Sequence, residues 1–433
     1  MKNNIFLLIA ASIFILSFSS CDDLLDVTPK DKITPETFFS TEADLQAFST
    51  NFYNSLPKDR DLYKDDADNI THSTPNSAAT DSRTVPASGG GWEWGYLRRF
   101  NTLLQYSVNC KDKTVRTRYQ ALTRFFRAYF YFEMVKRFGD IPWYDTELFV
   151  SETDQLNKPR DSRELVMKNI LEDLDFAITN LSTTPSVYTV TKWTALSLKS
   201  RVCLFEGTFR KYHNLNLSTN ADFFLQESIT ASRELMKESN YTLYTEGGTN
   251  QAYRKLFTSQ NAPTTEVIMA RNYNLTYDIY NTVGTYHTSV GEGRPGVTRK
   301  IIASYLMNDG SRFTDNPNWE TMTFVDECKN RDPRLAQSIC TPSYQPIVSN
   351  RKNIPDLNAC VTGYQLIKYE DEAVGGKSDI DLFYFRFSTV WHNHLRNKHL
   401  TEHLRNNSNE LATVRFSAFC GAMLSNNSFL MQR

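Results

Sequence analysis

Apolar side chains recur every three or four positions through five long stretches of this 433-residue chain, roughly 92–108, 117–138, 161–181, 191–212 and 221–238. In the second stretch, Phe125, Tyr129 and Phe132 follow the i, i+4, i+7 spacing that places side chains on one face of an α-helix. The pattern therefore predicts five helices of about twenty residues each.

These helices follow one another closely along the chain, and small residues lie inside their apolar faces, for example Ala128, Ala177 and Ala195. That combination is typical of stacked helical hairpins. No strict repeat of about 34 residues is present. We therefore predict a mainly α fold, a degenerate tetratricopeptide-like array of helical hairpins. Each hairpin leaves an apolar face that only its neighbour can bury, so the array would be a rigid scaffold with loops available for binding.

Local signals mark individual helices. Pro35 suits the first turn of a helix that carries Phe38, Phe39 and Phe48. Asp161 and Glu164 have the spacing of a capping box at the start of the 161–181 helix. Glu133 and Arg137, four residues apart on the 117–138 helix, are expected to pair on its solvent side.

The pattern changes after about residue 240. Short apolar runs, such as 266–270 and 364–369, are separated by Asn, Gly and Pro up to about residue 386. Neither strand alternation nor helical periodicity persists, which predicts an irregular α+β subregion. A Gly, Ser, Asn and Asp-rich stretch from 65 to 91 predicts a long loop, and loops of this length are usually functional or disordered.

The first residues have the character of a secretory signal. Lys2 precedes an apolar run from residue 5 to residue 18, which is too short to span a bilayer, and two serines then precede Cys21. We expect residues 1–20 to be a signal peptide and Cys21 to carry lipid. The polar, acidic residues 21–35 would then be a linker between the lipid and the folded part.

Composition narrows the function further. The net charge is -1 and the pI is near 6.7, so no nucleic-acid partner is indicated. The remaining cysteines show no CxxC pair, and we predict mostly free, buried thiols. No HExxH or GxSxG motif occurs, and Gly376-Lys377-Ser378 lacks the first glycine of a phosphate-binding loop, because residue 371 is Asp. We therefore expect no catalytic residues, no cofactor and no enzyme.

Several segments fit one known family in their order along the chain. They are Cys21–Asp26, Thr34-Pro35-Glu36, Trp94–Arg99 with Asn101, Arg124–Phe130 running into Arg137–Pro142, Ala195–Tyr212, Asn330–Arg334 and Lys377–Asp381. Together they resemble the SusD/RagB family of outer-membrane nutrient-binding lipoproteins over residues 21 to about 386. The domain implied by this resemblance runs from 36 to 386, with the helical scaffold over about 36–240 and the α+β part over about 241–386.

The resemblance also implies a function. A SusD-like protein would be a lipoprotein exposed on the outer membrane, which binds an oligosaccharide, or sometimes a peptide, and delivers it to a SusC-like TonB-dependent transporter. The acidic pair Asp22-Asp23 resembles the surface-export signal of such lipoproteins. Two alternatives from other classes stay open. One is a surface glycoside hydrolase, and the other is a helical-repeat adaptor that binds only protein.

The C-terminal residues depart from the family pattern. Instead of a helix rich in Ala, Glu, Leu and Tyr, the chain carries His392, His394, His399 and His403 within twelve residues. We interpret 387–433 as an atypical tail, truncated or frameshifted, and expect it to be disordered. Although two of these histidines have metal-ligand spacing, we expect them to bind no metal specifically.

Aromatic residues are the candidates for ligand binding, because sugar rings stack their C–H faces on flat π surfaces beside a few polar groups. Most aromatic residues here lie at helical spacing and are expected in the core. Trp92 follows three glycines at a loop-to-helix junction, where one ring can face solvent. The other candidates lie in predicted loops, and they are Tyr277, Tyr280, Tyr286, Arg294 and Trp319. Local packing within the loops is the competing explanation for each.

Overall fold

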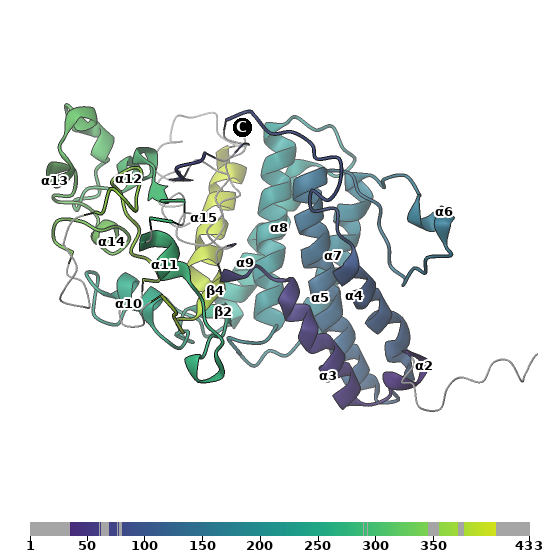
Figure 1. Ribbon diagram of the computed structural model, residues 1–433. Coiled ribbons are helices and arrows are strands. Elements are labelled where there is room, and N and C mark those ends of the chain that lie inside the picture. Colours follow the sequence, from purple (N-terminus) through teal and green to yellow (C-terminus); the bar gives the residue numbers. More distant parts are fainter. Residues whose placement is uncertain are drawn as a thin grey trace, which may run out of the picture.

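The computed structural model describes residues 35–403 except 60, 62–68, 76, 78–79, 289, 292, 345–354 and 371–375. Within these residues, long helices stand side by side in a row, and a region of short elements lies at one end of the row (Figure 1). The long helices are α4 Gly95–Tyr106, α5 Lys113–Phe138, α7 Arg163–Asn180, α8 Lys192–Tyr212, α9 Ala221–Glu238 and α15 Phe387–His403. The mainly α, tetratricopeptide-like array is confirmed. Cys21 and the predicted signal peptide lie outside the described residues.

Neighbours in the row are α4 and α5, then α7, α8, α9 and α15 in that order. The predicted helices match their observed counterparts except at their ends. Ser162, not Asp161, caps α7, because its Oγ accepts from the Leu165 N–H at 3.3 Å. The Asp161 carboxylate instead accepts from the backbone N–H of Trp143 at 2.7 Å. Glu164 pairs with Arg210 at 3.1 Å rather than closing a capping box.

The first predicted helix is divided in two. α2 spans Pro35–Phe38, and α3 spans Glu42–Thr50. The division is caused by Thr41, whose hydroxyl accepts from the Asp44 N–H while the Asp44 carboxylate accepts from the Thr41 N–H. This reciprocal capping box starts a new helix at that point.

Buried ion pairs join the helices of the array. Arg127 of α5 donates through Nε and Nη2 to both carboxylate oxygens of Asp173 of α7, at 2.7 and 2.8 Å. Glu206 of α8 is fully buried and receives both Arg163 of α7 and Arg210 of its own helix. The predicted pair Glu133 with Arg137 is not found, because Glu133 Oε1 binds Lys136 Nζ at 2.6 Å.

The region between α9 and α15 confirms the irregular α+β prediction. Its main elements are α10 Ala252–Thr258, β2 Val267–Arg271, α11 Val283–Thr288, β3 Gly296–Val297, α12 Arg299–Ser304, α13 Phe324–Glu327, α14 Pro333–Ala336 and β4 Leu382–Arg386. Strands β2 and β4 pair antiparallel, with Val267 opposite Arg386. A second antiparallel pair joins β3 to β1, Ile70–Thr71, with Ile70 opposite Val297. The stretch predicted to be a loop therefore also contributes a short strand.

A four-residue helix, α6 Thr153–Leu156, lies in the connection between α5 and α7.

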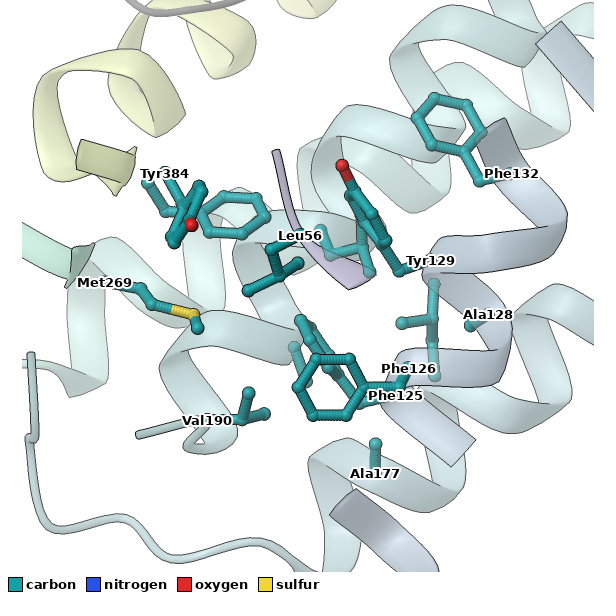
Figure 2. Close-up of a cluster of buried hydrophobic side chains, with 14 of the residues drawn as sticks. Leu56, Phe125, Phe126, Ala128, Tyr129, Phe132, Ala177, Val190, Met269 and Tyr384 are labelled. Atoms are coloured by element: carbon teal, nitrogen blue, oxygen red, sulfur yellow. The ribbon is translucent and has the colours of Figure 1, made fainter. Parts of the chain in front are cut away.

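The main hydrophobic core extends from the array into the β2–β4 sheet. Figure 2 shows Phe125 and Phe126 of α5 in one cluster with Leu56, Met269 of β2 and Tyr384 of β4. A smaller core lies within the α+β region, and it is formed by Val297, Ile301, Ile302, Tyr305, Leu335, Ile339 and Leu366. The two regions thus share one core, while the α+β region has a second core of its own.

Strand β4 passes directly into α15, since the strand ends at Arg386 and the helix begins at Phe387. Glu266 holds this junction. Its backbone oxygen accepts from the Phe387 N–H at 2.9 Å, and its carboxylate binds Arg386 Nη1 at 3.2 Å and Ser388 Oγ at 2.6 Å. The chain therefore returns from the α+β region to the array without an intervening turn.

The expectation of a disordered tail is wrong for residues 387–403. They form α15, which packs against α9 and α8 because it buries Val390 and Leu400 together with Asn397, whose amide donates to Ser228 Oγ at 2.6 Å. Residues 404–433 lie outside the described part. His392 and His394 contact different partners, the Ser388 backbone oxygen and Ser232 Oγ. The side chains of His399 and His403 are not among those described, so the prediction about metal binding stays a prediction.

Two further observations concern the thiols and the character of the helices. Cys110, Cys203 and Cys360 are buried free thiols, as expected. Of the helices within the described residues, none combines the length and the apolar character needed to cross a bilayer.

Candidate functional site

Two tyrosine rings project from the turn that connects β2 to α11. Tyr277 is 75% exposed and Tyr280 is 36% exposed, with the exposed Ile279 between them. Large apolar side chains at such exposure are candidates for contact with a ligand or partner, because solvation of their flat faces is unfavourable.

The turn has a defined backbone. Asn274 and Ile279 exchange two backbone hydrogen bonds, and the Asn274 side chain accepts from the Thr276 N–H at 2.9 Å. Asp278 adopts the left-handed conformation with φ 54°, which Asp tolerates better than most residues. The sequence Asn274–Ile279 therefore folds locally into a tight hairpin, and this hairpin presents Tyr277 at its tip.

Asp381 fixes the first arm of this hairpin, at Tyr273. Its fully buried carboxylate accepts from the backbone N–H groups of Tyr273 and Ala262, at 3.0 and 2.8 Å, and from the Tyr188 hydroxyl at 2.6 Å. Burial raises the pKa of Asp381, while these donors act in the opposite direction. Burial and the neighbouring carboxylate also raise the pKa of Tyr188, so the phenol remains protonated and donates.

Asn281 fixes the second arm. It exchanges backbone hydrogen bonds with Ser378, and its side-chain amide donates to the backbone oxygen of Ile380 at 2.8 Å. Its own carboxamide oxygen accepts from the Val283 N–H. Because both arms are held by buried side chains, the tyrosine rings are presented by a rigid turn rather than by a loose loop.

Lys377 adds charge beside the rings. Its Nζ lies 2.9 Å from Asp278 Oδ1 and 4.1 Å from the centre of the Tyr280 ring. The hydrogen bond to Asp278 raises the pKa of the Lys377 ammonium, so this group is charged at neutral pH. The turn thus combines two aromatic faces with an ammonium donor and a carboxylate acceptor, which suits hydroxyl-rich ligands.

Trp92 is partly exposed but is not part of the turn that carries Tyr277 and Tyr280. Its ring packs edge to face on Trp94 and Phe138, with centroids 5.2 and 4.9 Å apart, and the Arg160 guanidinium lies 5.1 Å from its centre. Trp94, in contrast, packs against the main core. Trp92 therefore sits at the end of the helical array, and its contacts are with that array.

Trp319, Tyr286 and Arg294 each contact other parts of the protein. The Trp319 ring is partly buried against Phe313, 6.0 Å away, with the Arg299 guanidinium at 5.6 Å. Packing against these two residues thus explains much of its placement. The Tyr286 hydroxyl contacts His72 Nε2, and Arg294 Nη2 donates to the Leu357 backbone oxygen at 2.6 Å.

Only part of the predicted set therefore comes together, namely Tyr277 and Tyr280. Sequence reasoning missed their companion Lys377 and the supporting residues Asp381 and Asn281 as parts of this site. Lys377 and Asp278 are 99 positions apart, so no local pattern could have joined them. The only signal was the alternation of polar and aromatic residues in 272–281.

Two family models match the chain. The model described as "Starch-binding associating with outer membrane" matches residues 23–204, and the model described as "SusD family" matches residues 255–389. The first match covers the array up to the middle of α8, and the second covers most of the α+β region, including the turn at Tyr277.

Individual proteins agree with these matches. SusD-like protein P38 of Formosa agariphila is 24% identical over 385 residues, which are 86% of this chain and 70% of that protein. The crystal structure of a SusD-like protein from Bacteroides fragilis is similar with a TM-score of 0.71 at 20% identity, over 92% of this chain and 88% of that one. A structure with xylogluco-oligosaccharide is similar with a TM-score of 0.60 at 14% identity, over 89% and 81% of the two chains. At these identities the structures establish a shared fold.

Proposed function

Because the chain belongs to the SusD/RagB family, we propose that it is a non-enzymatic receptor that binds an oligosaccharide at the cell surface and delivers it to a SusC-like TonB-dependent transporter. One observation of this molecule carries the binding part of the proposal. Tyr277 and Tyr280 stand exposed on a turn whose two arms are fixed by Asp381 and Asn281. A sugar ring stacked on either tyrosine would have Lys377 and Asp278 within reach of its hydroxyl groups.

Preorganisation is the physical reason that this turn suits a sugar. Oligosaccharides offer few apolar contacts, so the entropy lost on ordering a mobile loop would consume much of the binding free energy. A turn that is already rigid avoids that loss. The exposed pair Lys377–Asp278 also exchanges its hydrogen bonds easily with ligand hydroxyls, because surface ion pairs contribute little stability.

The binding proposal predicts that Tyr277→Ala and Tyr280→Ala each weaken oligosaccharide binding. Loss of one stacking surface costs about 1–2 kcal/mol, which is roughly a tenfold increase in Kd. Calorimetric titration with a panel of oligosaccharides, including xyloglucan fragments and starch fragments, provides the measurement. Tyr212→Ala is the matched control, since Tyr212 is an exposed tyrosine at the end of α8.

Two outcomes would contradict this proposal. If the Tyr277 and Tyr280 variants bind sugars as the Tyr212 control does, the turn is not the binding surface. If new reducing ends appear during incubation with polysaccharide, the protein is a hydrolase instead.

We further propose that the mature chain is anchored to the outer membrane through lipid on Cys21. Cys21→Ala should release the protein in soluble form with its thermal unfolding midpoint unchanged, because the described core begins at Phe39. Fractionation of cells that express each form is the measurement. Continued partitioning of the variant into the detergent phase would rule out this anchor.

A further inference from the structure

Lys377 and Asp278 form a charged pair on the surface of the Tyr277 turn. Lys377 Nζ lies 2.9 Å from Asp278 Oδ1, and both side chains are exposed. An ammonium carries three N–H donors and a carboxylate can accept several hydrogen bonds, so the bond between them leaves capacity on both groups. The pair therefore offers a ligand one donor and one acceptor at a defined separation.

The backbone that carries Lys377 is held on both sides. Before it, the Gly376 oxygen accepts from Thr285 Oγ1 at 3.0 Å. Gly376 has φ 101°, and a Cβ there would lie 3.1 Å from the same Thr285 oxygen, so glycine suits this position. After it, Ser378 exchanges two backbone hydrogen bonds with Asn281, each 2.9 Å long. Because Asn281 also fixes the second arm of the turn, the lysine and the turn share one anchor.

Tyr280 positions the ammonium. Lys377 Nζ lies 4.1 Å from the centre of the Tyr280 ring, within the range of a cation–π contact, so the lysine occupies one face of that ring. Tyr277 is the more exposed of the two rings, and it directly precedes Asp278 in the chain. The open stacking surface is therefore Tyr277, with the charged pair beside it.

We propose that Lys377 and Asp278 together recognise two hydroxyl groups on neighbouring carbons of a sugar ring that stacks on Tyr277. Neighbouring equatorial hydroxyls of a pyranose are gauche, so their oxygens lie within hydrogen-bond distance of each other, as Nζ and Oδ1 do. One hydroxyl oxygen accepts from Lys377, and the other hydroxyl donates to Asp278. Both bonds involve a charged group, which makes them stronger than bonds between neutral groups.

This geometry selects a class of glycan linkage. In a chain of hexoses linked through O4, each interior ring keeps the hydroxyls at O2 and O3, which are on neighbouring carbons. In a chain linked through O3, each interior ring keeps O2 and O4, which are not. The site therefore prefers chains linked through O4 to chains linked through O3. This inference rests on the proposed function, because it concerns a sugar bound at the Tyr277 turn.

The test is calorimetric titration of the full chain with cellohexaose, maltohexaose and laminarihexaose. The first two are linked through O4, whereas laminarihexaose is linked through O3 and keeps neighbouring hydroxyls only at its ends. We expect at least one O4-linked hexaose to bind about fivefold or more tightly than laminarihexaose. Lys377→Met should raise the Kd for that hexaose about tenfold, and Asp278→Asn about fivefold, since each removes a charge-assisted hydrogen bond. Both variants should also lose the preference over laminarihexaose.

Matched controls separate recognition from stability. Lys255 of α10 and Glu246 form another exposed pair, 3.2 Å apart, so Lys255→Met and Glu246→Gln should leave all three Kd values unchanged. Tyr280→Phe keeps the ring beside the ammonium and should retain the linkage preference, whereas Tyr280→Ala should lose it. Thermal unfolding midpoints should stay close to that of the wild type for the lysine and carboxylate variants, because exposed ion pairs contribute little stability.

The outcomes distinguish this inference from the proposed function. If a hexaose binds and Tyr277→Ala weakens it, but laminarihexaose binds equally well or Lys377→Met has no more effect than Lys255→Met, the turn remains a sugar site and the recognition of neighbouring hydroxyls is refuted. If no hexaose binds, or if Tyr277→Ala leaves binding unchanged, the sugar-binding turn is refuted, and this inference with it.

Discussion

The helical array and the α+β region are held together by different kinds of contact. In the array, helices satisfy their own backbone groups, and charged side chains such as Arg127 with Asp173 bind one another across helices. In the α+β region, ion pairs such as Arg386 with Glu266 also occur, but polar side chains bind the irregular backbone as well. Arg331, for example, donates to the backbone oxygens of Glu327, Ile302 and Tyr305. The difference shows how an irregular chain can be rigid, because buried side chains replace the hydrogen bonds that regular strands would make.

The largest loss of stability is expected from removing the Glu206 carboxylate, which binds two arginines of the array. Glu206→Gln leaves Arg163 without the one carboxylate that it binds among the described residues, and it weakens the surroundings of Arg210. Removing one partner of a buried ion pair costs about 3–5 kcal/mol, since the remaining charge stays buried. Urea unfolding measures the loss. Lys168→Met, which breaks an exposed pair with Glu172, is the control and should change stability by less than about 0.5 kcal/mol. Equal effects of the two substitutions would refute this account of the array.

A cavity in the smaller core tests whether the α+β region opens separately. Ile302→Ala should cost about 3 kcal/mol, because a buried side chain is truncated and the surroundings relax only in part. Hydrogen exchange should accelerate in 296–340 and remain slow in α5 and α7. Acceleration throughout the array would show that the two cores unfold as one unit.

Acid should weaken the α+β region through His287 of α11. Burial lowers the pKa of this histidine to about 3, so the folded state keeps it neutral. The stabilising contribution is complete above the unfolded pKa of 6.5 and is lost as pH falls from 6.5 towards 3, because only the unfolded chain takes up the proton. The slope is about 1.4 kcal/mol per pH unit. Urea unfolding at several pH values should show a shallower slope for His287→Gln, and an unchanged slope would contradict this assignment.

The sequence predicted the array better than it predicted the contacts inside it. The apolar stripe of α5 is a local pattern, so Phe125, Tyr129 and Phe132 could be assigned to one face without knowledge of their neighbours. Arg127 interrupts that stripe, and its partner Asp173 lies 46 positions away, so nothing local marked the pair as buried. Helix α15 was missed because its composition departs from the family pattern, although it still offers apolar side chains to α8 and α9.

Of the candidate site, only the two exposed tyrosine rings could be predicted from the sequence. Tyr277 and Tyr280 stand among polar residues, which favoured exposure, and the structure places them so. Trp319 appeared equally suitable in the sequence but packs between Phe313 and Arg299. Its neighbour Arg299 comes from a segment twenty positions earlier, so the burial of the tryptophan depends on tertiary structure. Asp381, which supports the Tyr277 turn, follows more than 100 positions later.

The direct passage of β4 into α15 has a mechanical consequence. A hinge needs a few residues that can change their backbone angles. Here the strand ends at Arg386 and the helix begins at Phe387, and Glu266 forms hydrogen bonds with both residues. Torque applied to the α+β region would therefore be transmitted along α15 into the array. A ligand bound at the Tyr277 turn would keep its orientation relative to the helices. Any movement that carries this ligand elsewhere would therefore rotate the whole molecule as one rigid body.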